Sequence, residues 1–291
     1  MELIEVPASG KDPHEVLESG NILFFPHQGS GLEEREKEFL RGVHLTGGKL
    51  HKNVAYKPAL DKVSGFDASS PELGDKLRTV LRRYSQWAIR FTAEVLPLYK
   101  NTWRLDYASF RPEEEEGRDL ARKKRNDLLH VDAFPTRPTH GDLILRVFTN
   151  ISANKPRVWL TSDPFAQLAP RYADDAGLGG IGTDRVRRNL TRGLKSIGLP
   201  VVDRSPYDRF MLSFHDYMKR NADYQKNCAK YRFELPPRST WMVFTDVVPH
   251  AVLSGQFALE QTFIISRDSL SDRESAPASI LERLSGKHLV A

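Results

Sequence analysis

Two histidines and one aspartate have the types and the spacing of a metal site. His130 and Asp132 are separated by one residue in the apolar run Leu-Leu-His-Val-Asp-Ala-Phe. Residues i and i+2 of a β-strand point to the same side, so an extended run brings both side chains to one point. Two histidines and a carboxylate on one face of an octahedron, with open positions opposite, are the ligands of mononuclear non-haem Fe(II) oxygenases. Such a set needs a second histidine.

A competing triplet, His140-Gly-Asp142, has the same spacing. The chain contains nine histidines and 38 acidic residues, so the triplet alone is a weak signal. The glycine and the preceding Arg-Pro-Thr are typical of a turn, whereas metal ligands need a rigid backbone. We therefore predict that His130 and Asp132 bind the metal and that His140 and Asp142 are turn residues.

The third ligand is predicted to be His250, which opens the run His-Ala-Val-Leu-Ser-Gly. It is the only histidine in the strand-rich C-terminal region, because His215 lies in a predicted helix and His288 in the tail. An isolated histidine of this kind is usually a structural residue, but the incomplete ligand set favours a metal role. His130, Asp132 and His250 are thus the predicted catalytic and metal-binding residues.

A basic residue within an apolar strand indicates a co-substrate site. 2-Oxoglutarate chelates the iron at one end and leaves a carboxylate at the other, which an arginine or lysine and neighbouring hydroxyls would hold. Arg146 lies in the run Leu-Ile-Leu-Arg-Val-Phe-Thr-Asn, and Thr262 is the predicted hydroxyl partner. Arg267, at the end of the last predicted strand, is the alternative anchor.

Strands must position most of these residues. Apolar and β-branched runs predict strands at 21–26, 102–110, 128–134, 143–151, 157–161, 231–235, 240–245, 250–254 and 257–266. Steps of three and four between apolar residues predict an amphipathic helix from Leu73 to Leu98. Many strands interrupted by one helical insert predict a mainly β fold with flanking helices, an antiparallel barrel or jelly roll.

We predict a single oxygenase domain over residues 1–291. Its predicted parts are an N-terminal strand and support helix in 1–100, a jelly-roll core in 101–266 with a helical insert at 162–228, and a C-terminal tail at 267–291 with a short helix at 278–285.

Composition narrows the remaining possibilities. The single cysteine, Cys228, excludes intramolecular disulfides and cysteine-built metal cages. No apolar stretch approaches the ~20 residues of a membrane span, and the acidic N-terminus is unlike a signal peptide, so a cytoplasmic location is expected. The net charge of +5 suits nucleic acid, anionic lipid or an acidic small substrate. The basic run 122–125 follows the acidic run 113–116, which favours a solvated loop there.

Longer segments carry a family resemblance: Leu-His-Val-Asp-Ala-Phe-Pro-Thr-Arg-Pro-Thr-His-Gly-Asp at 129–142, Ile-Leu-Arg-Val-Phe-Thr-Asn at 144–150, Pro-Arg-Val-Trp at 156–159, and His-Ala-Val-Leu-Ser-Gly-Gln-Phe-Ala-Leu-Glu-Gln-Thr-Phe at 250–263. They resemble the Kdo 3-hydroxylases, within the Fe(II)/2-oxoglutarate-dependent dioxygenase superfamily. The resemblance covers most of residues 100–265.

The resemblance implies a double-stranded β-helix core that uses Fe(II), 2-oxoglutarate and O2. It implies hydroxylation at C3 of 3-deoxy-D-manno-oct-2-ulosonic acid (Kdo) on lipid A, giving the sugar Ko. The implied partners are this glycolipid and, peripherally, the inner membrane, with no nucleic acid. Arg111, Arg137 and the run 122–125 are candidates for a basic mouth that would attract the glycolipid.

One feature departs from the superfamily pattern. Many members carry an arginine soon after the distal histidine, whereas Glu260 and Gln261 occupy that stretch here. Arg146 instead matches the place of the carboxylate-binding lysine in the asparaginyl and Jumonji-type hydroxylases. Two other functions stay open: a 2-oxoglutarate oxygenase for another small molecule, and a non-catalytic cupin-like protein that binds a metal or a sugar.

Overall fold

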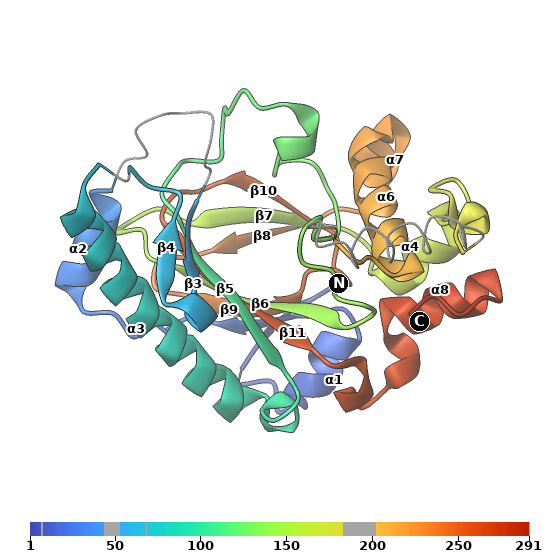
Figure 1. Ribbon diagram of the computed structural model, residues 1–291, viewed down its shortest axis with the longest axis horizontal. Helices are drawn as coiled ribbons and strands as arrows, with labels where there is room; N and C mark the ends of the chain where they lie inside the picture. Colours follow the sequence, from blue (N-terminus) through green and yellow to red (C-terminus); the bar gives the residue numbers. More distant parts are fainter. Residues whose placement is uncertain (7, 44–52, 68, 183–201, 291) are drawn as a thin grey trace, which may run out of the picture.

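Two β-sheets form the centre of the molecule, and helices lie on its outside (Figure 1). The computed structural model describes residues 1–6, 8–43, 53–67, 69–182 and 202–290. The strands are β1 Leu3–Glu5, β2 Ile22–Phe25, β3 Val54–Lys57, β4 Lys62–Ser64, β5 Arg104–Arg111, β6 Leu143–Asn150, β7 Arg157–Thr161, β8 Tyr231–Leu235, β9 Thr240–Phe244, β10 His250–Ser254 and β11 Ala258–Ile265. The helices are α1 Pro13–Glu18, α2 Glu34–Arg41, α3 Pro71–Val95, α4 Phe165–Tyr172, α6 Pro206–Arg220, α7 Ala222–Asn227 and α8 Pro277–Ser285.

The larger sheet has the strand order β1-β2-β9-β6-β11-β5-β3-β4, and the smaller sheet has the order β10-β7-β8. Strand β6 lies between β9 and β11, where Arg146 is opposite Val243 on one side and Thr262 on the other. Phe148, two residues along β6, packs against Trp159 of the smaller sheet. Because side chains alternate along a strand, Arg146 points to the same side, into the space between the sheets.

Aromatic side chains join the two sheets. The ring of Trp159 on β7 lies edge-to-face with Phe148, at 5.0 Å between centroids, and with Trp241 on β9, at 5.5 Å. Trp159 and Trp241 are fully buried. Edge-to-face pairs of this kind add roughly 0.5–1.5 kcal/mol to the burial of the rings, so this cluster closes the interior beside the predicted metal site.

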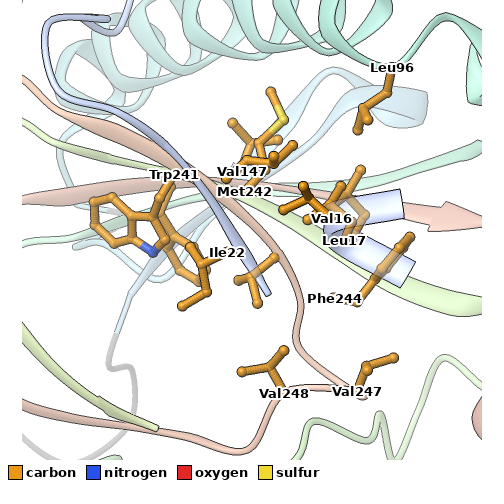
Figure 2. Packing of buried hydrophobic residues seen from close by; sticks show 14 of the residues in the cluster. Val16, Leu17, Ile22, Leu96, Val147, Trp241, Met242, Phe244, Val247 and Val248 are labelled. Carbon is orange, nitrogen blue, oxygen red and sulfur yellow. The ribbon is translucent and has the colours of Figure 1, made fainter. Parts of the chain in front are cut away.

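Helices α1 and α3 cover the outer side of the larger sheet (Figure 1). Figure 2 shows Val16 and Leu17 of α1 gathered with Met242 and Phe244 of β9 in the main hydrophobic core. Full burial of each such side chain contributes about 1.5–3 kcal/mol. This layer fixes the strands whose other face lines the site.

The long predicted helix is confirmed, with different ends. Helix α3 begins after Ser70, whose hydroxyl accepts a hydrogen bond from the backbone N–H of Leu73. It ends at Val95, because Pro97 disfavours helical geometry in the residue before it and cannot donate a backbone hydrogen bond. Leu98 therefore lies outside α3 and is exposed.

The strands predicted from residue 143 onward are confirmed, as are 21–26, 102–110 and the short helix near 278–285. The strand predicted at 128–134 is wrong: this run forms only an isolated bridge to β10. The short elements β1, β3, β4, α1 and α2 were not predicted. Helices α4, α6 and α7 lie within the predicted insert, of which residues 183–201 fall outside the described residues. No described helix is both long and apolar enough to cross a membrane.

Candidate metal centre

Two of the predicted metal ligands, His130 and His250, are joined by a pair of backbone hydrogen bonds. The N–H of His130 donates to the carbonyl of His250 at 3.2 Å, and the N–H of His250 donates back at 2.9 Å. The N–H of Asp132 donates to the carbonyl of Thr245 at 2.8 Å. The segment 128–134 is thus fixed by bonds to separate points, which explains why it is rigid without being a strand.

The three side chains converge on one point. Each of His130, Asp132 and His250 offers a ligand atom, and these atoms lie within 4.8 Å of one another. The Nδ1 atoms of the two histidines contact the carbonyls of Leu128 (2.7 Å) and Val248 (3.0 Å). A ring nitrogen that donates to a carbonyl fixes the tautomer and leaves Nε2 as the ligand atom. Both Nε2 atoms face Asp132, at 4.0 and 3.8 Å from its oxygens.

The electrostatics of this triad suit a divalent cation. Burial, together with neighbouring cationic groups, lowers the pKa of His130 and of His250, which favours the neutral imidazoles that bind metals. Burial opposes ionisation of Asp132, but Arg146 and the two histidines hold its pKa well below the usual range. The buried Oδ2 atom of Asp132 accepts no hydrogen bond within the described part of the chain. An ionised carboxylate that lies beside two free imidazole nitrogens fits Fe(II).

A buried charge network lies next to the triad. The Nε atom of Arg146 is 3.2 Å from Asp132 and 3.5 Å from Glu260, and Glu260 also pairs with Arg111 at 2.8 Å. Although burial opposes it, Arg146 and Arg111 lower the pKa of Glu260 to about 2. Glu260 of β11 thus lies between two arginines, Arg146 of β6 and Arg111 of β5, which are on the two strands that flank β11.

A cavity of about 260 Å³ opens over the triad. Trp159 stacks on the ring of His250 with centroids 5.2 Å apart, and Phe134, Phe148 and Val252 also line the walls. The cationic residues that line it are Arg111, Lys123, Lys124, Arg146, Arg157 and Lys219, against Asp132 as the lining carboxylate. The cavity therefore suits anionic molecules.

The structure separates the remaining predicted residues from the cavity. Thr262 is buried beside Arg146, but its hydroxyl donates to Glu260 at 2.5 Å. Arg267 pairs with Glu282 at 3.3 Å and does not line the cavity. His140 lies in a turn with φ 55°, as predicted.

Of the candidates for a basic mouth, Arg111, Lys123 and Lys124 line the cavity. Arg137 does not. It pairs with Asp106 and lies over the rings of Tyr107 and Phe134, at 4.2 Å from each centroid.

Among the ionisable residues that line the cavity, three were not predicted: Arg157, His215 and Lys219. Arg157 is the first residue of β7, and its sequence position is typical of the end of a loop. In the structure it is fully buried and pairs with Glu115 at 3.3 Å. Helix α6 carries His215 and Lys219 on one face. Their spacing of four residues in a predicted helix could have indicated that both side chains lie on the same face.

The model of the 3-deoxy-D-manno-oct-2-ulosonic acid (Kdo) hydroxylase family matches residues 3–288. No match to a curated protein was found.

Similar solved structures are those of the Kdo hydroxylase KdoO, a non-heme Fe(II) alphaketoglutarate dependent dioxygenase. Its apo structure is 38% identical, covers 95% of this chain and 90% of that chain, and has a TM-score of 0.84. The complex with alphaketoglutarate and Fe(III) is 37% identical over 95% and 90% of the two chains, with a TM-score of 0.82. The complex with succinate and Fe(III) is 37% identical over 96% and 90%, with a TM-score of 0.83. The predicted jelly-roll core with flanking helices is thereby confirmed.

Proposed function

The chain belongs to the Kdo hydroxylase family, and from this we propose that it is an Fe(II)/2-oxoglutarate-dependent dioxygenase that hydroxylates C3 of Kdo carried on lipid A, giving Ko. The observation that carries the proposal is the convergence of His130, Asp132 and His250 at the base of a cation-lined cavity. A metal without an anion site would serve many reactions. This combination suits a carboxylated co-substrate and a carboxylated sugar together.

His130, Asp132 and His250 would hold the iron, leaving the cavity side for the co-substrate and oxygen. Iron bound there supplies oxygen activation, coupled to the conversion of 2-oxoglutarate into succinate and carbon dioxide. The chain's own part is to hold the imidazoles through backbone carbonyls, to keep Asp132 ionised through Arg146, and to exclude water with Trp159. The sugar's C3 methylene must lie over the open side of the triad.

Arg146 is our proposed anchor for the far carboxylate of 2-oxoglutarate. It lines the cavity beside the triad, whereas Arg267 is engaged with Glu282 outside it. Arg111 supports the same end through Glu260, and Thr262 acts through Glu260 by its hydroxyl. A charge-assisted pair with an arginine fork provides both affinity and orientation.

The lipid part of the substrate agrees with the cationic rim. Lys123 and Lys124 are exposed and line the cavity mouth, and the whole chain carries a net charge of +5. Phosphorylated glycolipids at an anionic membrane surface would be attracted to such a rim. We therefore propose peripheral contact with the cytoplasmic face of the inner membrane.

The test is anaerobic reconstitution with Fe(II), followed by 2-oxoglutarate, oxygen and a panel of acceptors. Kdo-lipid A should gain one oxygen atom by mass spectrometry, in step with succinate release. Hydroxylation of an amino acid or another sugar, with Kdo-lipid A unchanged, would favour a different substrate. Tight metal binding with no succinate from any acceptor would favour a non-catalytic binding protein.

A further inference from the structure

Two groups of cations line the cavity, and they differ in their partners. The strand arginines, Arg111, Arg146 and Arg157, each face a buried carboxylate, at 2.8 to 3.3 Å. The helix lysines are Lys123 and Lys124 of the 3-10 turn η3 (Arg122–Lys124) and Lys219 of α6. The strand arginines thus belong to a network that is already neutralised in part.

Lys219 is buried and forms no ion pair with a carboxylate of the described residues, although Asp132, Asp216 and Asp127 act on it at longer range. It is 6% exposed, and no carboxylate oxygen of the described residues lies within 4.0 Å of its ammonium nitrogen. Its hydrogen bond goes to the backbone carbonyl of Lys123, at 3.3 Å. Two nearby carboxylates pair with other cations: Asp216 pairs with Lys123 at 3.2 Å, and Asp127 pairs with Arg125.

An arrangement of this kind is costly unless an anion completes it. An ammonium group has three donors, and among the described residues only the carbonyl of Lys123 accepts a hydrogen bond from it. Removing such a charge from water is unfavourable when it is not paired. Burial accordingly lowers the pKa of Lys219 below its ordinary value. A ligand carboxylate in the cavity would provide the missing partner.

Helix α6 places this ammonium close to the reacting end of the site. His215 and Lys219 are four residues apart and share one face of the helix (orange in Figure 1). The ring of His215 lies edge-to-face with the ring of His130, with centroids 4.9 Å apart, and its Nδ1 contacts the carbonyl of Val131 at 2.7 Å. Lys219 is therefore four residues, or ~6 Å, along the helix from a side chain that touches a predicted metal ligand.

We infer that Lys219 binds the carboxylate of the sugar acid and thereby places its neighbouring methylene over the metal. This assignment rests on the proposed function. In Kdo the carboxylate carbon C1 is bonded to C2, and C2 is bonded to C3, the carbon to be hydroxylated. A cation that holds the carboxylate near the metal consequently fixes C3. It also discriminates sugar acids from neutral sugars, while the strand arginines remain for the co-substrate.

The experiment compares the wild-type enzyme with Lys219→Met, Lys219→Arg and, as a matched control, Lys226→Met, a change of an exposed lysine on the adjacent helix α7 that does not line the cavity. Binding of free Kdo is measured by calorimetry without oxygen, in the presence of Fe(II) and 2-oxoglutarate. Kinetics use Kdo-lipid A and its analogue with the sugar carboxylate converted to a carboxamide.

Lys219→Met should weaken Kdo binding and raise the KM for Kdo-lipid A by at least ~10-fold, the usual scale for losing a charge-assisted pair. Its affinity for 2-oxoglutarate should change much less than its affinity for Kdo. Lys219→Arg should recover most of the binding, and Lys226→Met should behave as the wild type. The carboxamide should bind the wild type and Lys219→Met equally weakly.

The assignment is overturned if Lys219→Met binds Kdo as tightly as the wild type, or if it loses affinity for 2-oxoglutarate instead. Equal binding of the acid and the carboxamide by the wild type overturns it as well, whatever the variants' stability. A wild type that turns over 2-oxoglutarate but neither binds nor hydroxylates a Kdo acceptor refutes the proposed function itself, and this assignment with it.

Discussion

At the scale of single residues, the triad is held by contacts that a substitution removes selectively. His130→Ala, Asp132→Ala and His250→Ala should each abolish turnover and weaken Fe(II) binding, because each removes one of three converging ligand atoms. His140→Ala, in the turn, should retain iron. Anaerobic Fe(II) titration followed by calorimetry measures iron binding in each variant, and succinate release measures turnover. Iron loss from His140→Ala with retention in His130→Ala would reverse the assignment.

Arg146 has a separable effect on the co-substrate. Arg146→Ala should raise the concentration of 2-oxoglutarate needed for half-maximal activity by at least ~10-fold, since losing a charge-assisted pair costs more than ~1.4 kcal/mol. Iron should stay bound, because the three ligands remain. Arg267→Ala is the control and should change little, as Arg267 pairs with Glu282 away from the cavity. If Arg267→Ala had the larger effect, Arg267 would be the anchor.

Asp246 links stability to pH. It is fully buried, its Oδ1 accepts a hydrogen bond from the N–H of Ile144 at 3.0 Å, and burial raises its pKa to about 7. In the unfolded chain this carboxyl ionises near its ordinary value of 3.8. Between these two pH values the folded state binds more protons, so the free energy of unfolding falls as the pH rises.

Asp246→Asn removes this proton uptake and keeps the acceptor for Ile144. The stability of the variant relative to the wild type should therefore rise from pH 4 to pH 7 and then level off, by up to about 4 kcal/mol in total. Urea unfolding of the metal-free proteins at a series of pH values measures it. Asp119→Asn, at an exposed carboxylate, should give a flat difference. A flat difference for Asp246→Asn would show that its pKa is ordinary in the folded state.

At the scale of elements, most of the sheet was predictable because its strands are long apolar runs. The strands β5 to β11 and helix α3 each show either a continuous apolar run or apolar residues at regular spacing, as expected of an element with a buried face. The elements β1, β3, β4, α1 and α2 have three to eight residues. So short a segment gives too few positions for a period to emerge, and partners distant in the sequence decide its structure.

The site was predictable where a residue type contrasts with its strand. The position of Arg146 beside buried carboxylates could be predicted, because a cation within an apolar run needs a buried anion; its role as the co-substrate anchor stays a prediction. The ligand segment at 128–134 has the composition of a strand, yet its backbone partners come from four places, including the side chains of Gln225 and His215. Lys219 could not be distinguished from a solvated helical lysine, because its burial depends on η3 packing over α6.

The segment between β5 and the triad is held over the cavity by Glu115. This buried glutamate pairs with Arg157 at 3.3 Å and accepts hydrogen bonds from Asn126 at 3.1 Å. Glu115→Ala leaves Arg157 buried without its partner, which should destabilise the fold by roughly 3 kcal/mol or more. Glu116→Ala, at the exposed neighbouring position, is the matched control and should cost little. Denaturant unfolding decides, and equal stability of the two variants would contradict a structural role for the Glu115–Arg157 pair.

At the scale of the whole molecule, the excess of basic residues should govern encounter with the substrate. Binding to vesicles that contain anionic lipid should weaken as salt rises from 50 to 500 mM, because the Debye length falls from roughly 14 to 4 Å. Lys123→Glu/Lys124→Glu should weaken binding further at low salt, since both lysines lie at the exposed rim. Vesicle sedimentation measures this. Equal binding to neutral vesicles would exclude electrostatic docking.

The mutual backbone bonds of His130 and His250 give the metal a further role. They join a segment before the helical insert to a strand after it, and the intervening chain includes β6 to β9. A metal ion held by both side chains would be a reversible cross-link that closes this long loop. A cross-link lowers the entropy of the unfolded chain only if it persists in that state. A metal that binds only the folded state stabilises it by mass action instead. Iron would thus act on the lifetime of the enzyme as well as on its chemistry, and iron-starved cells would hold a form that is more readily degraded.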